Sequence, residues 1–182
     1  MKKALVIVDI QNDYFPGGKM ELHASEAAGA RAGALLAHFR DRGLPIVHIQ
    51  HISARPGATF FLPDTDGVRI HASVAPAADE TVIQKHFPNA FRDTRLLDHL
   101  RQHAIEELVI AGMMTHMCVD ATTRAAADLG FRCSLASDAC ATRALSFGGT
   151  TVPADHVHTS FLAALSGAYA TVRPASELAV AE

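Results

Sequence analysis

Three residues whose side chains can do chemistry each follow a short run of residues typical of a β-strand. Asp9 follows VIV, Lys85 follows TVIQ, and Cys118 follows LVIAGMMTHM at the start of an expected helix. Ligands of open α/β sheets bind beyond the carboxyl ends of the strands. We therefore expect a carboxylate, an ammonium group and a thiol to meet at one edge of a sheet.

These three groups fit nucleophilic catalysis by a cysteine. A helix N-terminus and a nearby cation lower the pKa of a thiol, and Lys85 can supply the cation for Cys118. The carboxylate of Asp9 can accept the thiol proton and return it to a departing amine. The turn AGMMTHMC can also direct backbone N–H groups at one point as an oxyanion hole, with Gly112 giving the chain freedom to turn.

Each residue also has an ordinary structural explanation. A cysteine is often a small buried hydrophobic residue, an Asp after a strand can cap a turn, and Lys85 could be a solvated surface charge. Cys133 alternates within an apolar strand and is expected in the core, whereas Cys140 lies in a loop. The joint placement at three strand ends favours chemistry over these alternatives.

The segments that would position these residues alternate between β-rich and helical patterns. The first, Lys3 to Val8, is an almost uninterrupted apolar run, as expected for a strand buried on both faces of a parallel sheet. Further strands are expected at 45–50, 81–84, 108–111, 131–136 and 168–172, and helices at 25–41, 93–102, 116–129 and 154–164. This order predicts an α/β fold, a three-layer αβα sandwich around a mostly parallel six-stranded sheet.

The composition is that of an ordinary globular chain. Its 182 residues fit one domain, residues 1–182, with 49% hydrophobic and 19% charged residues. A formal net charge of −3, without a run of like charges, argues against nucleic acid or an anionic membrane as a partner. The N-terminal apolar run is too short for a membrane helix, and three cysteines suggest a reducing cytosol. We expect a cytoplasmic protein.

Two irregular stretches, 53–80 and 138–153, are longer than ordinary connections and could cover a pocket or be tolerated surface insertions. Aromatic side chains on loops beside the three strand ends are candidates for substrate contact. They are Phe15, Phe60, Phe61, Phe87 and His116. The alternative is that buried aromatic rings anchor these loops.

Three segments resemble motifs of the isochorismatase-like cysteine hydrolases, which include nicotinamidases and N-carbamoylsarcosine amidase. They are IVDIQNDYFPGG, VIQKHFPNAF and AGMMTHMCVDATTRAAADLG, in order over nearly the whole chain. The resemblance implies a Rossmann-like αβα sandwich, a homo-oligomer, and a catalytic triad that falls on Asp9, Lys85 and Cys118. It also implies an oxyanion hole at the backbone N–H groups of Met114 and Cys118, and a cis peptide between Met113 and Met114.

The chain departs from two members of this family. True isochorismatases lack the nucleophilic cysteine, so Cys118 argues against hydrolysis of a vinyl ether. Metal-dependent nicotinamidases carry an Asp-x-His pattern after the second strand, where this chain reads HIQHISARPG. His48 and His51 point to opposite faces of an extended strand, so we expect no metal and no other cofactor, although His51 could line the pocket entrance.

Residues and resemblance together predict a hydrolase that cleaves a C–N bond of a small amide, imide or carbamoyl compound through a thioester. The alternative is a non-hydrolytic, thiol-based redox or small-molecule-binding protein on the same fold. The presence of both Asp9 and Lys85 favours the enzyme. A dinucleotide-dependent oxidoreductase is excluded because DIQNDYFPGG, and not G-x-G-x-x-G, follows the first strand.

Overall fold

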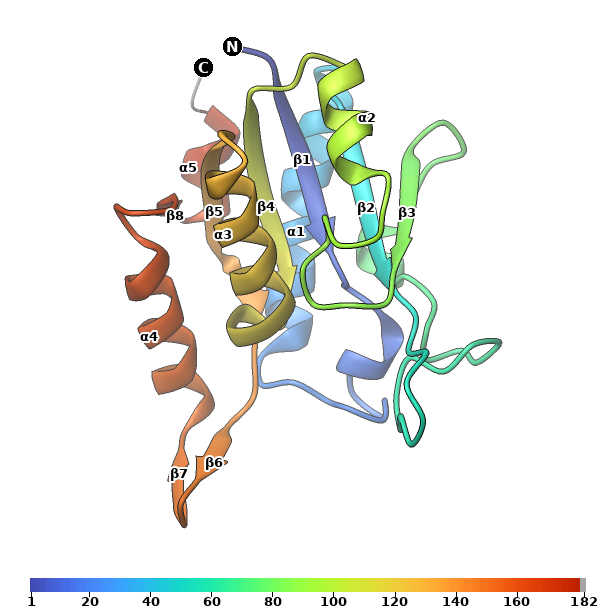
Figure 1. Ribbon diagram of the computed structural model, residues 1–182, viewed down its shortest axis with the longest axis vertical. Coiled ribbons are helices and arrows are strands. Elements are labelled where there is room, and N and C mark those ends of the chain that lie inside the picture. Colours follow the sequence, from blue (N-terminus) through green and yellow to red (C-terminus); the bar gives the residue numbers. More distant parts are fainter. Residues whose placement is uncertain (181–182) are drawn as a thin grey trace.

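The structure, a computed structural model, describes residues 1–180 and is built around a parallel sheet (Figure 1). The six strands of this sheet are β1 (Lys3–Val8), β2 (Ile46–His51), β3 (Thr81–Lys85), β4 (Glu107–Met113), β5 (Arg132–Ala141) and β8 (Thr171–Arg173). They lie in the order β3-β2-β1-β4-β5-β8, and every neighbouring pair is parallel. The direction of winding reverses at β1, so the crevice beyond β1 and β4 is the expected ligand site.

Helices cover both faces of the sheet (Figure 1). One face packs against α1 (Ser25–Asp41) and α5 (Ala175–Val180), and the other against α2 (Leu96–Gln102), α3 (Asp120–Asp128) and α4 (Ala154–Leu165). The side chains of the central strand β1 point alternately to the two faces of the sheet, so β1 contributes to both apolar layers. Leu5 and Ile7 join the apolar cluster on the α1 side, whereas Val6 and Val8 join the opposite cluster. The predicted three-layer αβα sandwich is confirmed.

Several elements differ from the expectation. Residues 138–153 are not irregular: β5 runs on to Ala141, and a hairpin of β6 (Leu145–Phe147) and β7 (Thr150–Val152) follows and projects from the body (Figure 1). Helix α2 begins three residues later than expected, because Asp93 has a left-handed backbone with φ 55°. The helix expected at 116–129 begins as a π-helical turn, Thr115–Val119, before α3.

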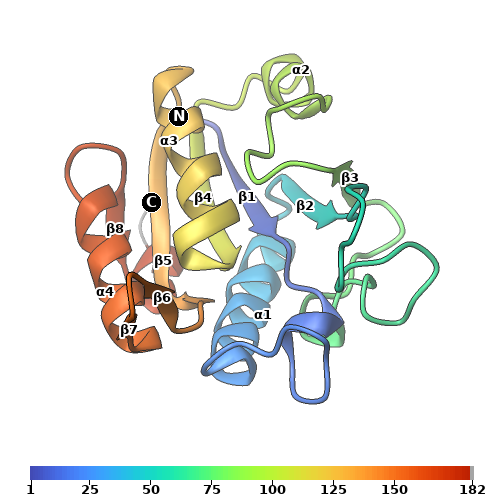
Figure 2. The same ribbon diagram turned by 60° about the horizontal axis from the view of Figure 1, so that its bottom comes forward.

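The loops that follow β1 and β2 gather at the carboxyl end of the sheet, which comes forward in Figure 2. The long stretch 53–80 is irregular apart from one 3₁₀ turn, Ala72–Val74. It is tied to the end of β1 by an isolated bridge between Gln11 and Ile70. Within residues 1–180, no helix combines the length and the apolar composition that crossing a bilayer requires.

Candidate active site

The carboxyl ends of three strands bring Asp9, Lys85 and Cys118 into contact. Asp9 directly follows β1, Lys85 ends β3, and Cys118 lies in the π-helical turn after β4. The ammonium nitrogen of Lys85 lies 2.7 Å from Asp9 Oδ2 and 3.3 Å from Cys118 Sγ. All three side chains are buried, with exposed fractions of 0%, 1% and 4% respectively. The structure thus places the three residues as the sequence predicted.

His51 completes the surroundings of the Lys85 ammonium group. It is the last residue of β2 and pairs with Lys85 in the β2–β3 register, and its Nδ1 lies 2.9 Å from Lys85 Nζ. Burial, and then the charge of Lys85, lower the pKa of His51 to about 4, so the ring is neutral in neutral solution. Because an ammonium group can only donate, Nδ1 accepts and the ring proton must reside on Nε2.

Gln11 fixes the backbone of His51. The amide nitrogen of Gln11 donates to the His51 carbonyl at 2.9 Å, and the His51 N–H donates to Gln11 Oε1 at 2.8 Å. The same amide nitrogen donates to the carbonyl of Val68 in the long loop at 2.7 Å. Gln11 is fully buried, so these bonds join the ends of β1 and β2 to the loop without competition from water.

The resting thiol differs from the expectation of a lowered pKa. Burial raises the pKa of Cys118 far above its ordinary value, the Asp9 carboxylate raises it further, and the Lys85 ammonium opposes both. For Lys85, burial lowers the pKa, but Asp9 and Cys118 more than compensate and raise it. Cys118 is therefore protonated at rest. Its sulfur lies within 4.8 Å of a carboxylate oxygen of Asp9, which can accept the proton during attack.

The turn that carries Cys118 is closely packed against β1. Gly112 has φ 151°, and a Cβ at this position would lie 2.1 Å from the carbonyl oxygen of Val8, so only glycine fits. The peptide between Met113 and Met114 is cis, as the resemblance implies. The oxyanion hole at the backbone N–H groups of Met114 and Cys118 stays a prediction.

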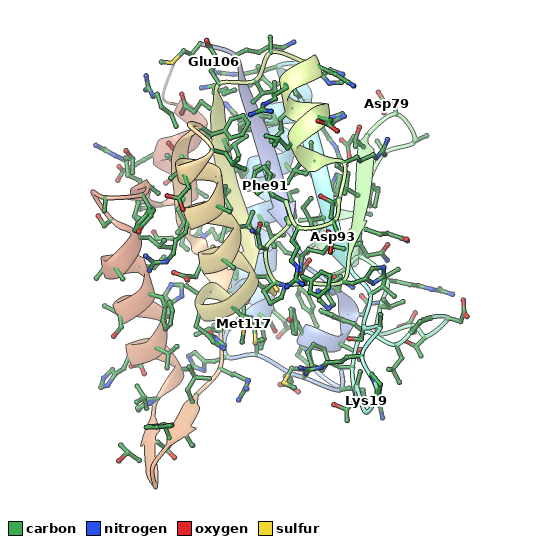
Figure 3. The ribbon with its side chains drawn as sticks, in the orientation of Figure 1. Lys19, Asp79, Phe91, Asp93, Glu106 and Met117 are labelled. Carbon is green, nitrogen blue, oxygen red and sulfur yellow. The ribbon has the colours of Figure 1, made fainter. Side chains whose placement is uncertain are left out.

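A cavity of about 340 Å³ opens beside Cys118. Seven of its fifteen described lining residues are large apolar or aromatic side chains, which are Tyr14, Met20, Phe60, Phe61, Phe87, Met114 and Met117. Met117, labelled in Figure 3, lies at the carboxyl end of the sheet beside the loops. Since Cys118 is almost completely buried and lines this cavity, the cavity provides the access to its sulfur. Phe60, Phe61 and Phe87 thus lie where the sequence predicted.

Two predicted substrate contacts lie elsewhere. Phe15 stacks on His71 with ring centroids 3.5 Å apart, and it lies against Gly29 of α1, where a Cβ would come within 3.0 Å of the ring. The absence of a side chain at Gly29 makes room for Phe15 to turn inward, away from the cavity. His116 is buried and does not line the cavity, and its Nδ1 is hydrogen-bonded to Thr142 Oγ1.

Sequence reasoning missed several residues of the cavity wall, among them Tyr14, Met20, Arg55 and Arg143. A signal existed for Arg143, which lies two residues beyond the carboxyl end of β5, at the same edge of the sheet as Asp9. Met20 and Arg55 lie on loops and Tyr14 ends a short 3₁₀ turn, Asn12–Tyr14, where position along the chain does not determine the direction of a side chain.

Asp9, His51 and Cys118 together offer oxygen, nitrogen and sulfur ligand atoms within 4.8 Å of one another. A zinc ion accepts all three atom types. The Lys85 ammonium group, however, already contacts all three side chains, at 2.7, 2.9 and 3.3 Å. A metal ion at their centre would therefore have to displace a buried cation. His48 points away from this group and lies 2.8 Å from Glu80.

Comparison with known proteins assigns the family. The family model described as the isochorismatase domain matches residues 3–174. The chain belongs to the isochorismatase family. The family protein YddQ of Bacillus subtilis is 52% identical over 95% of this chain and 96% of its own. A crystal structure of an isochorismatase hydrolase from Oleispira antarctica is 51% identical, covers 99% of this chain and 97% of its own, and superposes with a TM-score of 0.94.

A more distant relative is the nicotinamidase of Escherichia coli, which is 27% identical over 76% of this chain and 82% of its own. Membership of this family makes the protein an isochorismatase-type hydrolase. The groups that such a hydrolase has available here are the thiol of Cys118, the carboxylate of Asp9 and the ammonium group of Lys85.

Proposed function

We propose that this protein hydrolyses a C–N bond of a small amide, imide or carbamoyl compound through a thioester on Cys118. The observation that carries the proposal is the Lys85 ammonium group in contact with both Asp9 and Cys118 beside a cavity of about 340 Å³. The similarity to a nicotinamidase, an amide hydrolase by its name, supports the same reaction type.

The first half of the reaction forms the thioester. Cys118 Sγ attacks the carbonyl carbon while its proton passes to the Asp9 carboxylate, which gives a tetrahedral intermediate with a negative oxygen. Backbone N–H groups of Met114 and Cys118 would stabilise this oxygen. Collapse of the intermediate breaks the C–N bond, and the leaving nitrogen takes the proton back from Asp9.

The second half releases the acid. Asp9 accepts a proton from water, the resulting hydroxide attacks the thioester carbonyl, and the C–S bond breaks as the proton returns to Cys118. Lys85 stays protonated throughout and stabilises each state in which charge builds on sulfur, because its ammonium group lies 3.3 Å from Sγ. Each proton that leaves the thiol or water therefore passes through a single carboxylate.

The burial of the thiols argues against the redox alternative. A redox-sensing cysteine needs thiolate character and exposure to solvent. Burial raises the pKa of Cys118 far above its ordinary value and raises those of Cys133 and Cys140 to about 12. All three thiols are free and buried. A thiol that is protonated at rest beside a carboxylate suits attack on a bound substrate better than exchange with a soluble oxidant.

A screen of small amides for ammonia release, coupled to intact-mass detection of an acyl group on Cys118, tests the proposal. Cys118→Ala should abolish turnover and acylation, because it removes the nucleophile. Cys118→Ser should be nearly as inactive, because Asp9 is a weak base for a hydroxyl group.

Asp9→Asn should also lose turnover, since an amide cannot accept the thiol proton. The double variant should be scarcely worse than either single one, because the two residues act as a unit. Substantial activity in Cys118→Ala would refute the covalent route and favour attack by water activated by Asp9.

A further inference from the structure

Tyr14 is a buried side chain of the cavity wall that carries a polar group at its end. It is 1% exposed and lines the cavity of about 340 Å³ together with Cys118. Its backbone N–H donates to the Gln11 carbonyl and its carbonyl accepts from the Leu22 N–H, each at 3.0 Å. Its ring packs against that of Phe61, with centroids 4.6 Å apart. The phenol is therefore held in one place relative to the nucleophile.

The hydroxyl group of Tyr14 has no partner in the part of the chain that the structure describes. Among residues 1–180, the side chain makes ring contacts with Phe60 and Phe61 but no hydrogen bond. Most buried hydroxyl groups in proteins are paired, because an unpaired one costs free energy. A phenylalanine ring would fill the same space without this cost. The hydroxyl group of Tyr14 is thus left for a molecule that enters the cavity.

The same hydroxyl group keeps its proton and can donate it to a hydrogen bond. Burial raises the pKa of Tyr14 well above its ordinary value, and the charges that Cys118 and Asp9 carry when ionised raise it further. The phenol is therefore protonated in neutral and mildly alkaline solution. Both charged groups belong to the candidate active site, which agrees with the position of Tyr14 beside the nucleophile.

We propose that the Tyr14 hydroxyl group donates a hydrogen bond to the substrate, which therefore carries a second hydrogen-bond acceptor near its amide group. This inference rests on the proposed amide hydrolysis and narrows it to amides with an ether, hydroxyl or carbonyl oxygen close to the reacting carbon. The oxyanion hole proposed at Met114 and Cys118 takes the amide carbonyl oxygen, so the acceptor for Tyr14 is a different atom. Tyr14 is then a specificity-determining residue, because an amide with only hydrocarbon in this place leaves the buried hydroxyl group unpaired.

Pairs of uncharged amides that differ in one group test this assignment. The probes are methoxyacetamide with butyramide, and β-methoxypropionamide with valeramide, in which an ether oxygen replaces a methylene group of nearly the same size. No probe carries a charge, so the cationic residues Arg55 and Arg143 of the cavity wall do not separate the members of a pair. Ammonia release should give a kcat/KM for the ether about fivefold or more above that of the hydrocarbon in at least one pair.

Tyr14→Phe removes only the hydroxyl oxygen and should lower kcat/KM for the ether about fivefold or more, with little change for the hydrocarbon. Comparing the two proteins cancels the inductive effect of the ether oxygen on the carbonyl group. Tyr169→Phe is the matched control, since Tyr169 contacts Arg124 outside the cavity, and it should keep the ratio of the unmodified protein. Urea unfolding of Tyr14→Phe should show no loss of stability, because no hydrogen bond within the protein is removed.

Binding to Cys118→Ala separates this inference from the proposed reaction, because no turnover is needed. The chain has two tyrosines and no tryptophan, so in Cys118→Ala combined with Tyr169→Phe the tyrosine absorption comes from Tyr14 alone. The ether of at least one pair should shift this absorption to longer wavelength and bind about fivefold or more tightly than its hydrocarbon partner. This result without hydrolysis of any amide by the unmodified protein would leave the inference standing and overturn the reaction.

Four outcomes would overturn the inference alone. The first is an unchanged ratio of ether to hydrocarbon in Tyr14→Phe. The second is an equal loss for both members of each pair, which would assign the hydroxyl group to the hydrolytic water. The third is a loss of stability in Tyr14→Phe, which would show that the hydroxyl group is bonded within the protein. The fourth is a tyrosine absorption that neither ether shifts.

Discussion

Lys85 is the residue that contacts the other polar side chains of the candidate active site. Its three ammonium hydrogens face three acceptors, the Asp9 carboxylate at 2.7 Å, His51 Nδ1 at 2.9 Å and Cys118 Sγ at 3.3 Å. The side chain is buried, so neither water nor salt screens these interactions. The same cation therefore orients the carboxylate and stabilises negative charge on the sulfur.

Replacing Lys85 by Met should raise the pKa of Cys118 still further, because it removes the one cause that lowers it. Alkylation of Cys118 by iodoacetamide at pH 9 should slow by about tenfold or more, since an opposite charge at this distance shifts a pKa by about 1–3 units. Lys2→Met, which removes an exposed lysine, provides the control. Equal alkylation rates in the two variants would show that Lys85 does not act on the thiol.

The same cation determines the response to metals. Because the Lys85 ammonium group already contacts the oxygen, nitrogen and sulfur atoms that a metal would need, we expect dialysis against EDTA to leave the rate of amide hydrolysis unchanged. Added zinc should inhibit by binding the thiolate instead of activating. Loss of activity on chelation, restored by zinc, would contradict this arrangement.

Strand ends made part of the site predictable from the sequence. Asp9, Lys85 and Cys118 follow runs that the sequence indicates as strands of a parallel sheet, so the expectation that they meet follows from topology. The contact between His51 and Lys85 follows from the same logic, because both end neighbouring strands, but it needs the register of β2 and β3. Phe15 was misplaced, because its direction depends on the space above Gly29, fourteen residues further along the chain.

At the scale of elements, the long stretch 53–80 is fixed where it reaches the cavity. The backbone N–H of Phe61 donates to the Asp13 carboxylate at 2.7 Å, and the Phe61 carbonyl accepts from Ser53 N–H at 2.9 Å. The ring of Phe61 is 1% exposed and lies 4.6 Å from that of Tyr14. Phe60 packs against the same cluster but is only partly buried. The two neighbouring rings therefore have different roles.

Single alanine substitutions should separate these roles. Phe61→Ala should lower the free energy of unfolding by about 3 kcal/mol or more, because it removes a fully buried ring. Phe60→Ala should cost much less stability and instead raise KM, since Phe60 lines the cavity from a partly exposed position. Urea unfolding and steady-state kinetics on both variants measure the two effects. Equal losses of stability would contradict the distinction.

Element boundaries were predictable where the composition of a segment is distinctive, and they were wrong where the local backbone conformation determines the boundary. The helix at 25–41 and the strand at 3–8 agree with the structure residue for residue. The β6–β7 hairpin was missed because its strands are three residues long and mostly exposed, so they carry no apolar pattern. Helix α5 was missed for a similar reason, since it spans only six residues.

At the scale of the whole molecule, the sheet order makes β1 the meeting point of both halves of the sheet. The active-site candidates lie at its carboxyl end, and the apolar clusters lie on its two faces. The projecting β6–β7 hairpin exposes 92% of the Phe147 side chain. The homo-oligomer stays a prediction, which light scattering on the purified protein would test.

Buried neutral histidines should make the whole molecule sensitive to acid. Burial lowers the pKa of His48, and burial together with Lys85 lowers that of His51 to about 4. Between pH 6.5 and 4 these histidines bind protons in the unfolded chain but not in the folded protein. The free energy of unfolding therefore falls as the pH falls. Below pH 4.5 Glu80 adds to the loss, because its hydrogen bond with Arg40 lowers its pKa to about 2.

Melting temperatures measured from pH 8 to pH 4 should therefore fall steadily below pH 6.5. His51→Gln should flatten this fall, because it removes a group that contributes up to about 3 kcal/mol of pH-dependent stability over that window. His156→Gln, which removes a histidine whose side chain is 71% exposed, is the matched control. The same slope in His51→Gln as in the unmodified protein would show that folding does not lower the pKa of His51.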